Sequence, residues 1–121
     1  MELMEGSDTM NSVSIIGRLT RDAELIDFND LLKKGIKFTL AVDRSRKNAD
    51  GEKVADFIPV VYFTEHWEKL QPCLSKGKLI SVHGKLAYRS YTDSNNMKKS
   101  SIDVVADGIE FLESKQKSNA V

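Results

Sequence analysis

The chain has 121 residues, the size of one ordinary domain, and a hydrophobic fraction of 40%, enough for one compact core. Its 18 basic and 18 acidic residues cancel, which argues against the strongly cationic chain typical of nucleic-acid binding, so any basic surface must be local. A single cysteine excludes an intrachain disulfide, and no apolar run approaches the ~20 residues of a membrane helix. We therefore expect a soluble, cytoplasmic protein from a reducing compartment.

The first predicted strand follows an irregular start. Residues 1–9 show no hydrophobic periodicity and are expected to form a disordered extension before the folded unit, which begins at Met10. In residues 11–21 the odd positions from Val13 to Leu19 hold apolar residues or glycine, and the even positions are mostly polar. This period of two predicts a strand with one buried face.

Two further strands are predicted in the next forty positions. Residues 22–35 form a polar connection with scattered apolar residues, after which residues 36–45 alternate again and predict a second strand. A charged loop follows, around an Asp-Gly turn signal at 50–51. Residues 56–63, DFIPVVYF, predict a third strand, which must lie at an edge or carry a bulge because Pro59 lacks a backbone N–H.

The third strand is apolar on both faces, which raises the question of what its outward rings do. Tyr62 occupies an even position and is expected to point into the core, whereas Phe57 and Phe63 share the odd face. Either the helix or a partner subunit covers this odd face, or its rings are available for stacking on a ligand.

One helix is predicted, over residues 64–77. Thr64 can cap it, Pro72 should end or kink it, and Gly77 is a stop signal. Its apolar residues lie three or four positions apart and form one stripe: Trp67, Leu70 and Leu74. The stripe indicates that Trp67 packs on the core rather than against a ligand.

A long fourth strand, residues 78–93, and a final strand or strand pair, residues 98–113, complete the pattern. In the fourth strand the even positions Ile80, Val82 and Leu86 are expected to fill the core, and Gly84 suggests a bend. Its odd face carries three side chains suited to a nucleic acid: Lys85, Arg89 and Tyr91.

The order of three strands, one helix and two strands predicts an all-β fold: a five-stranded Greek-key barrel of the OB-fold type, with the helix between strands 3 and 4. A sandwich with one decorating helix is the alternative. The barrel is expected to span residues 10–112, and residues 113–121 to form a short flexible tail without an acidic tip.

Rings and cations on the outward side of such a barrel suit single-stranded nucleic acid, because bases stack on aromatic rings and cations follow the phosphates. Taken one at a time, the cations could equally be part of an ordinary solvated surface. Taken together, the candidate nucleic-acid-binding residues are Phe57, Phe63, Tyr91, Arg89, Lys85, Arg46, Arg44, Lys47, Arg18 and Arg21.

Five segments in the right order resemble the bacterial single-stranded DNA-binding proteins. They are MNSVSIIGRLTRDAEL, FTLAVDRS, DFIPVVYF, LSKGKLISVHGKLAYRSYTD and VVADGIEFL, and the resemblance covers Met10 to about Leu112. It implies an OB-fold that binds single-stranded DNA without sequence preference in replication, recombination and repair, associated with the nucleoid and usually as a homotetramer. It also implies stacking roles for Phe57, Phe63 and Tyr91, the positions to which strand alternation points.

The chain departs from the family pattern in three places. Arg46 stands where a stacking aromatic residue is common, and Ala23 stands where proline is frequent, which predicts a more flexible first loop. The acidic tip by which family members recruit replication and repair enzymes is not found in residues 113–121, so the resemblance does not extend to that recruitment. A truncated chain and a tail-less variant from a phage or mobile element are the two explanations.

Other kinds of site find little support. His66 and His83 lack partners at ligand spacing, so we expect no metal, and no catalytic motif or phosphate loop indicates an enzyme or a cofactor. The alternative function is an OB-fold adaptor or primosome-type module that works through protein–protein assembly.

Overall fold

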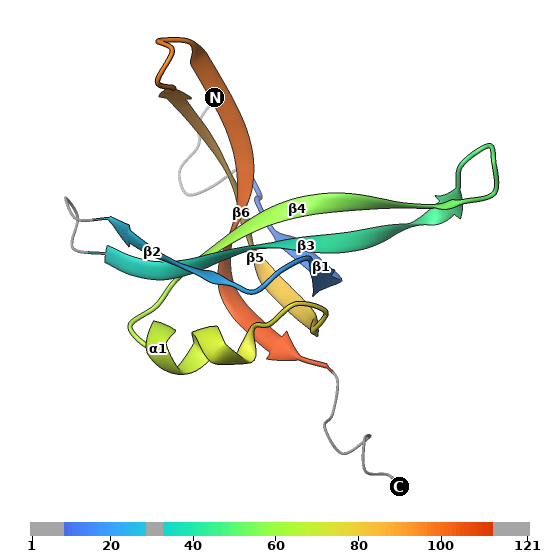
Figure 1. Cartoon of the computed structure of the whole chain (residues 1–121), viewed down its shortest axis with the longest axis horizontal. Helices are drawn as coiled ribbons and strands as arrows, with labels where there is room; N and C mark the ends of the chain where they lie inside the picture. The colour runs from blue at the N-terminus through green and yellow to red at the C-terminus, as the bar shows by residue number, and fades with distance from the viewer. Residues whose placement is uncertain (1–8, 29–32, 113–121) are drawn as a thin grey trace, which may run out of the picture.

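The computed structural model describes residues 9–28 and 33–112 (Figure 1). Its strands, in chain order, are β1 (Val13–Leu19), β2 (Glu24–Phe28), β3 (Lys33–Lys47), β4 (Lys53–Phe63), β5 (Leu79–Thr92) and β6 (Lys98–Phe111). The helix α1 (Trp67–Leu70) lies between β4 and β5 and runs into a 3-10 turn, Gln71–Cys73. Apart from Thr9, the expected extension and tail at residues 1–9 and 113–121 lie outside the described residues.

Five of the strands close into a barrel. Neighbouring strands follow the order β1-β5-β6-β4-β3, and β3 returns to β1, where Arg18 lies opposite Ala41. The pairings are antiparallel except between β4 and β6, where Val60 lies beside Val104 in a parallel arrangement. The predicted five-stranded barrel is therefore confirmed, with α1 between its third and fourth strands, and the alternative sandwich is wrong.

β2 is a strand that the sequence did not indicate. It pairs with β3 in an antiparallel hairpin, with Glu24 opposite Lys37. The expectation that residues 22–35 form only a connection is therefore wrong for Glu24–Phe28 and for residues 33–35, which belong to β3. The segment ELIDF carries no alternation of polar and apolar residues, which is the signal on which strand prediction depends. Its pairing comes instead from the edge of β3, which offers backbone hydrogen-bonding groups.

The core forms from the inward positions of the barrel strands and from the end of the helical segment. The even positions of β3 and β4 and the odd positions of β1 point inward, as their alternation predicts. Tyr62, Trp67 and Leu70 are partly buried and pack against the core. The buried apolar residues are Leu19, Ala23, Ile36, Phe38, Leu40, Val60, Leu74, Ile80, Val82, Val104 and Ala106.

The helix is shorter than its sequence pattern suggested. The α-helical turns end at Leu70, and Pro72 falls within the 3-10 turn that follows. A proline ring clashes with the carbonyl four residues earlier in an α-helix, which explains the early end. The expected cap at Thr64 is wrong: the N-cap residue is His66, which makes no side-chain cap hydrogen bond, and Thr64 Oγ1 accepts only from the backbone N–H of His66, at 3.0 Å, in the turn before the helix. Among the described residues no helix is long and apolar enough to span a membrane.

The first loop is tied to the helical segment at Ala23. The N–H of Ala23 donates to the carbonyl of Leu74 at 2.9 Å, and its carbonyl accepts from the side-chain amide of Gln71 at 3.1 Å. A proline at position 23 could not make the first bond, because it has no N–H. These bonds offset the greater freedom expected from the absence of proline.

A β-bulge shifts the pairing between β5 and β6. The register between the two strands shifts at His83 and Gly84, where Asp107 is skipped on β6. Gly84 is required there, because an added Cβ would collide with the carbonyl of Val105 and lie 2.8 Å from the Cα of Ala106. Beyond this bend the hairpin continues past the barrel wall (Figure 1), so Leu86 is 48% exposed and not in the core as expected.

Candidate nucleic-acid interface

The outward face of β3 and β4 carries the rings of the third predicted strand. Phe57 lies opposite Ala41 on β3 and is 66% exposed, because the small neighbour leaves its ring uncovered. Phe63 lies opposite Gly35 and is partly buried. Its ring packs onto that glycine, where an added Cβ would lie 3.2 Å from Cδ1 of Phe63. The predicted faces are confirmed for both rings and for the inward Tyr62.

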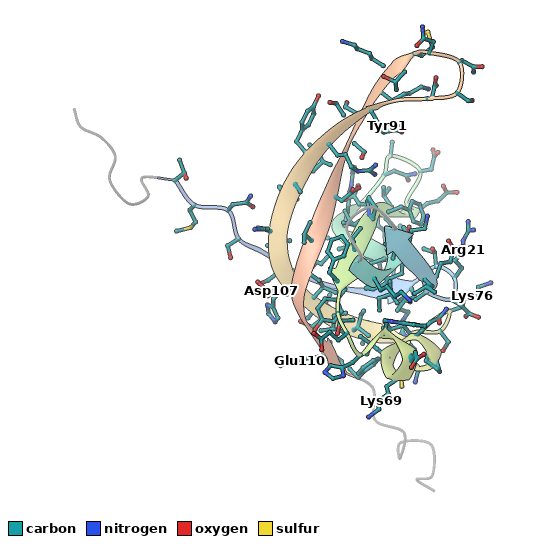
Figure 2. The ribbon with its side chains drawn as sticks, turned by 90° about the vertical axis from the view of Figure 1, so that its left-hand side faces the viewer. Arg21, Lys69, Lys76, Tyr91, Asp107 and Glu110 are labelled. Atoms are coloured by element: carbon teal, nitrogen blue, oxygen red, sulfur yellow. The ribbon has the colours of Figure 1, made fainter. Side chains whose placement is uncertain are left out.

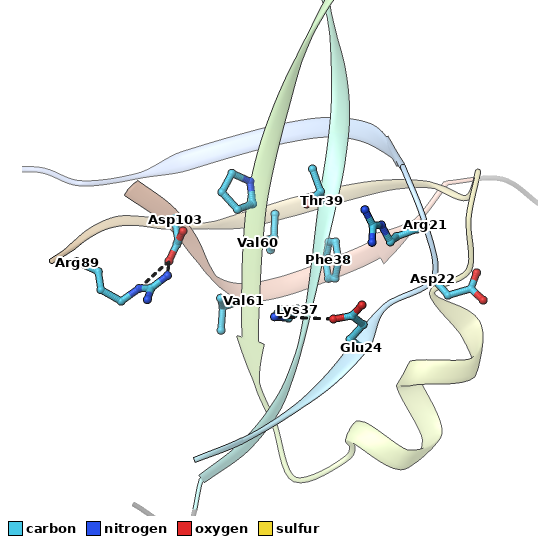
Figure 3. A pocket seen from close by; sticks show the side chains of 11 residues that line it. Arg21, Asp22, Glu24, Lys37, Phe38, Thr39, Val60, Val61, Arg89 and Asp103 are labelled. Carbon is cyan, nitrogen blue, oxygen red and sulfur yellow. Dashed lines mark hydrogen bonds and ion pairs between the residues drawn. The ribbon is translucent and has the colours of Figure 1, made fainter. Parts of the chain in front are cut away.

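A groove of about 350 Å³ crosses this face between the two rings. Its floor comes from the middle of β3 and β4, including Thr39, Pro59 and Val61 (Figure 3). On one side stand Arg21 and other residues of the first loop and β2, and on the other side stand two residues of the β5–β6 hairpin. Pro59 contributes an apolar ring to this floor.

The walls of the groove carry charged pairs. Lys37 Nζ lies 3.8 Å from Glu24 Oε1 on the side of β2. On the opposite wall, Arg89 Nη2 lies 3.2 Å from Asp103 Oδ2 (Figure 3). The groove is therefore lined by cations whose charges are partly balanced by carboxylates, in keeping with the zero net charge of the chain.

Arg89 also contacts the third predicted ring. Its guanidinium carbon lies 5.3 Å from the centre of the Tyr91 ring, a cation–π arrangement. Tyr91 is 44% exposed and follows Arg89 by two positions, so the two side chains share one face of β5. Figure 2 shows Tyr91 on the hairpin, far from Lys69 on α1. Lys85 is exposed on the same strand, opposite Val105 of β6.

The β3–β4 hairpin carries the second group of predicted cations. Arg44 forms three hydrogen bonds with the carboxylate of Asp56, the shortest 2.8 Å from Nη2 to Oδ1. These bonds hold the pKa of Asp56 below its ordinary value and raise the pKa of Arg44. Lys47 is exposed near the tip, whereas the side chain of Arg46 lies outside the described residues.

The remaining predicted cations lie at the border of the face. Arg18 is on β1 opposite Ala41, and its Nη1 donates to the carbonyl of Gly77 at 2.9 Å, which turns it toward the loop before β5. Arg21 follows in the first loop and lines the groove. The structure thus brings Phe57, Phe63, Arg21, Arg89 and Tyr91 to one side of the barrel, with Arg44 and Lys47 farther out on a hairpin.

Sequence reasoning missed three residues of this face: Lys37, Asp56 and Asp103. Lys37 could have been found, since it alternates outward from the buried Ile36 and Phe38 on β3. Asp56 and Asp103 could not have been found, because the register between neighbouring strands determines which cation each carboxylate meets. Asp56 lies on β4 directly opposite Val42, and Arg44, two positions further along β3, reaches it diagonally across the ladder.

The two histidines differ in their contacts. His83 lies between the hydroxyls of Ser14 and Ser81, at 3.1 Å from Nδ1 and 3.4 Å from Nε2. The backbone carbonyl of His66 accepts hydrogen bonds from Lys69 and Leu70 in the first turn of α1. Within residues 9–28 and 33–112, no group of three His, Cys, Asp or Glu side chains could hold a metal ion.

Comparisons with known proteins agree with this geometry. Residues 10–112 match the family described as "Single-strand binding protein family". The chain is 43% identical over 106 residues to "Single-stranded DNA-binding protein 2" of Staphylococcus aureus, covering 88% of this chain and 76% of that protein. It is 34% identical over 109 residues to "Single-stranded DNA-binding protein 1" of Clostridium acetobutylicum, covering 90% and 99%.

A solved structure shares the fold. The chain superimposes on the protein in "Plasmodium falciparum SSB complex with ssDNA" with a TM-score of 0.73, covering 90% of this chain and all of that one. The sequence identity is 20%, so this likeness concerns the architecture, and it confirms the predicted OB-fold.

Proposed function

This chain belongs to the single-strand binding protein family, and on that premise we propose that it binds single-stranded DNA without sequence preference. The observation that carries the proposal is the shared outward face of exposed rings and cations around a groove. Relatives at about 40% identity bear the name single-stranded DNA-binding protein, which supports the same substrate. The family consists of DNA-binding proteins, so we assign no enzymatic activity.

The binding mode follows from the chemistry of the face. Bases stack on Phe57, Phe63 and Tyr91, each stacked base contributing roughly 1–3 kcal/mol, and stacking does not discriminate between bases. The phosphates are met by the surrounding cations: Arg89, Lys85, Arg46, Arg44, Lys47, Arg18, Arg21 and, in addition, Lys37. A duplex hides its base faces, so it should bind much more weakly than a single strand.

The proposal includes a homotetramer in the cytoplasm, at the nucleoid, where replication, recombination and repair expose single strands. Exposed large apolar side chains away from the groove support self-association, because apolar surface is commonly buried at subunit interfaces. Ile16 on β1 is 55% exposed, and Leu86 and Ile102 lie on the inner face of the β5–β6 hairpin.

A second candidate function, a protein-binding adaptor, draws on the same apolar surface. On the hairpin, Tyr88 lies opposite Ile102, and both are more than half exposed. Sizing with and without an oligonucleotide separates the two functions. An assembly that forms regardless of DNA and binds no oligonucleotide would favour the adaptor.

The direct test compares two ligands of equal length. We expect the protein to bind a fluorescent dT oligonucleotide far more tightly than a duplex, as measured by fluorescence anisotropy at one fixed salt concentration. Anisotropy of a labelled oligonucleotide is preferable to protein fluorescence because Trp67 packs on the core under Lys34, away from the groove. Equal affinity for the duplex would contradict the proposal.

A further inference from the structure

A buried carboxylate lies beside a surface that otherwise suits an anionic ligand. Asp103 on β6 is 9% exposed and lines the groove. A carboxylate at a phosphate-binding face repels the ligand, and its burial costs free energy unless it is paired. Its position therefore needs a reason other than attraction of DNA.

We propose that Asp103 is a positioning residue for single-strand binding: it fixes Arg89 as a rigid backing behind the Tyr91 ring, whose free side then receives a base. The inference rests on the proposed function and assigns a role to a carboxylate that touches no DNA itself.

The contacts of Asp103 fix the direction of the arginine. Nε of Arg89 donates to Oδ2 of Asp103 at 3.3 Å, and Nη2 lies 3.2 Å from the same oxygen. Two nitrogens of one planar group held by one carboxylate leave the guanidinium little rotational freedom. The residue directly opposite Asp103 on β5 is Ala87, whose small side chain leaves space for Arg89 to reach back diagonally.

The fixed guanidinium lies against Tyr91. The distance of 5.3 Å from its central carbon to the ring centre places it within the range of a cation–π contact. The guanidinium thereby covers one face of the Tyr91 ring. Tyr91 remains 44% exposed, so the rest of its side chain faces the solvent. A ring that is already ordered loses less side-chain entropy when a base stacks on it, so the stacked base is held more tightly.

The positioning role and simple electrostatics predict opposite changes in DNA affinity when Asp103 loses its charge, and this difference provides the test. If Asp103 only repelled phosphates, Asp103→Asn would tighten DNA binding. As a positioning residue, its loss should weaken binding of a dT oligonucleotide about 5-fold, part of the roughly 5- to 150-fold that one stacked base is worth. The matched control is Asp56→Asn, which removes an equally charged partner of Arg44 from an exposed pair and should tighten binding.

Anisotropy titrations of the full chain, with thermal melting to confirm folding, decide the matter. Asp103→Asn should have no further effect in a Tyr91→Ala background, whereas a general structural role would cost the same factor in both backgrounds. Tighter or unchanged binding by Asp103→Asn, or an unchanged cost in the Tyr91→Ala background, would overturn the inference.

A second variant covers the case in which Asp103→Asn fails to fold. Arg89→Lys keeps the charge and leaves Asp103 a partner but removes the planar group, so it should weaken dT binding by a similar factor, and wild-type affinity would overturn the inference. Binding by the wild-type protein distinguishes a failure of the proposed function from a failure of the inference about Asp103. Failure of the wild type to bind dT refutes the proposed function, whereas wild-type binding with unaltered variants refutes only the role of Asp103.

Discussion

Replacing Phe57 by alanine should separate DNA binding from folding. The ring is 66% exposed, so only about a third of the 3–5 kcal/mol that a fully buried Phe→Ala change costs applies, or about 1–1.7 kcal/mol of stability. In a domain of about 100 residues such a loss lowers Tm by roughly 4–14 °C. The loss of one stacked base should reduce affinity for dT roughly 5- to 150-fold.

The matched control is Tyr88→Ala. Tyr88 is an aromatic residue of comparable exposure, at 71%, but it lies on the inner face of the β5–β6 hairpin with Ile102. Anisotropy titrations with a labelled dT oligonucleotide at fixed salt, on variants that sizing shows to keep the wild-type oligomeric state, should show a large loss for Phe57→Ala and little change for Tyr88→Ala. Equal affinities of wild type and Phe57→Ala, with both proteins folded, would mean that this ring does not contact DNA.

Three further predictions concern charge and backbone. Because hydrogen bonds from Arg44 hold the pKa of Asp56 below its unfolded value, the pair stabilises the fold above that value and loses its effect as pH falls through the folded pKa. NMR titration should show this pKa rising in Arg44→Ala, and an unchanged midpoint would contradict the assignment. Gly84→Ala should lower Tm by forcing the Val105 carbonyl away, and wild-type Tm would show that the bend adapts freely. Affinity for dT should fall with salt at a log–log slope of about 0.7 per phosphate contacted, and a slope near zero would exclude phosphate contacts.

Strand alternation is a sufficient guide in the parts of the strands that form the barrel wall, where one face packs on the core. In β1, β3 and β4 it placed the core residues and, by exclusion, put Phe57 and Phe63 outside. It failed in β5 because the sequence marks Gly84 as a bend but does not show that the hairpin then leaves the barrel. Leu86 continues the apolar series without a core to enter.

The charge partners of the face were beyond sequence reasoning for a different reason. Asp103 and Arg89 are on neighbouring strands, and their meeting depends on the β5–β6 register, which includes a shift at the bulge. A slip by one residue would place Asp103 on the other face. The cations could be listed from the sequence, but which of them are held by carboxylates is a property of the fold.

Ultraviolet crosslinking of the intact chain to a dT oligonucleotide, with the modified residues identified by peptide mass spectrometry, would locate the bound strand on the barrel. The outward face of β3, β4 and the β5–β6 hairpin should carry the crosslinks, at Phe57, Phe63 and Tyr91. Crosslinks confined to α1, or to the face of β1 and β5 around Ile16 and His83, would contradict the assignment of this face to single-stranded DNA.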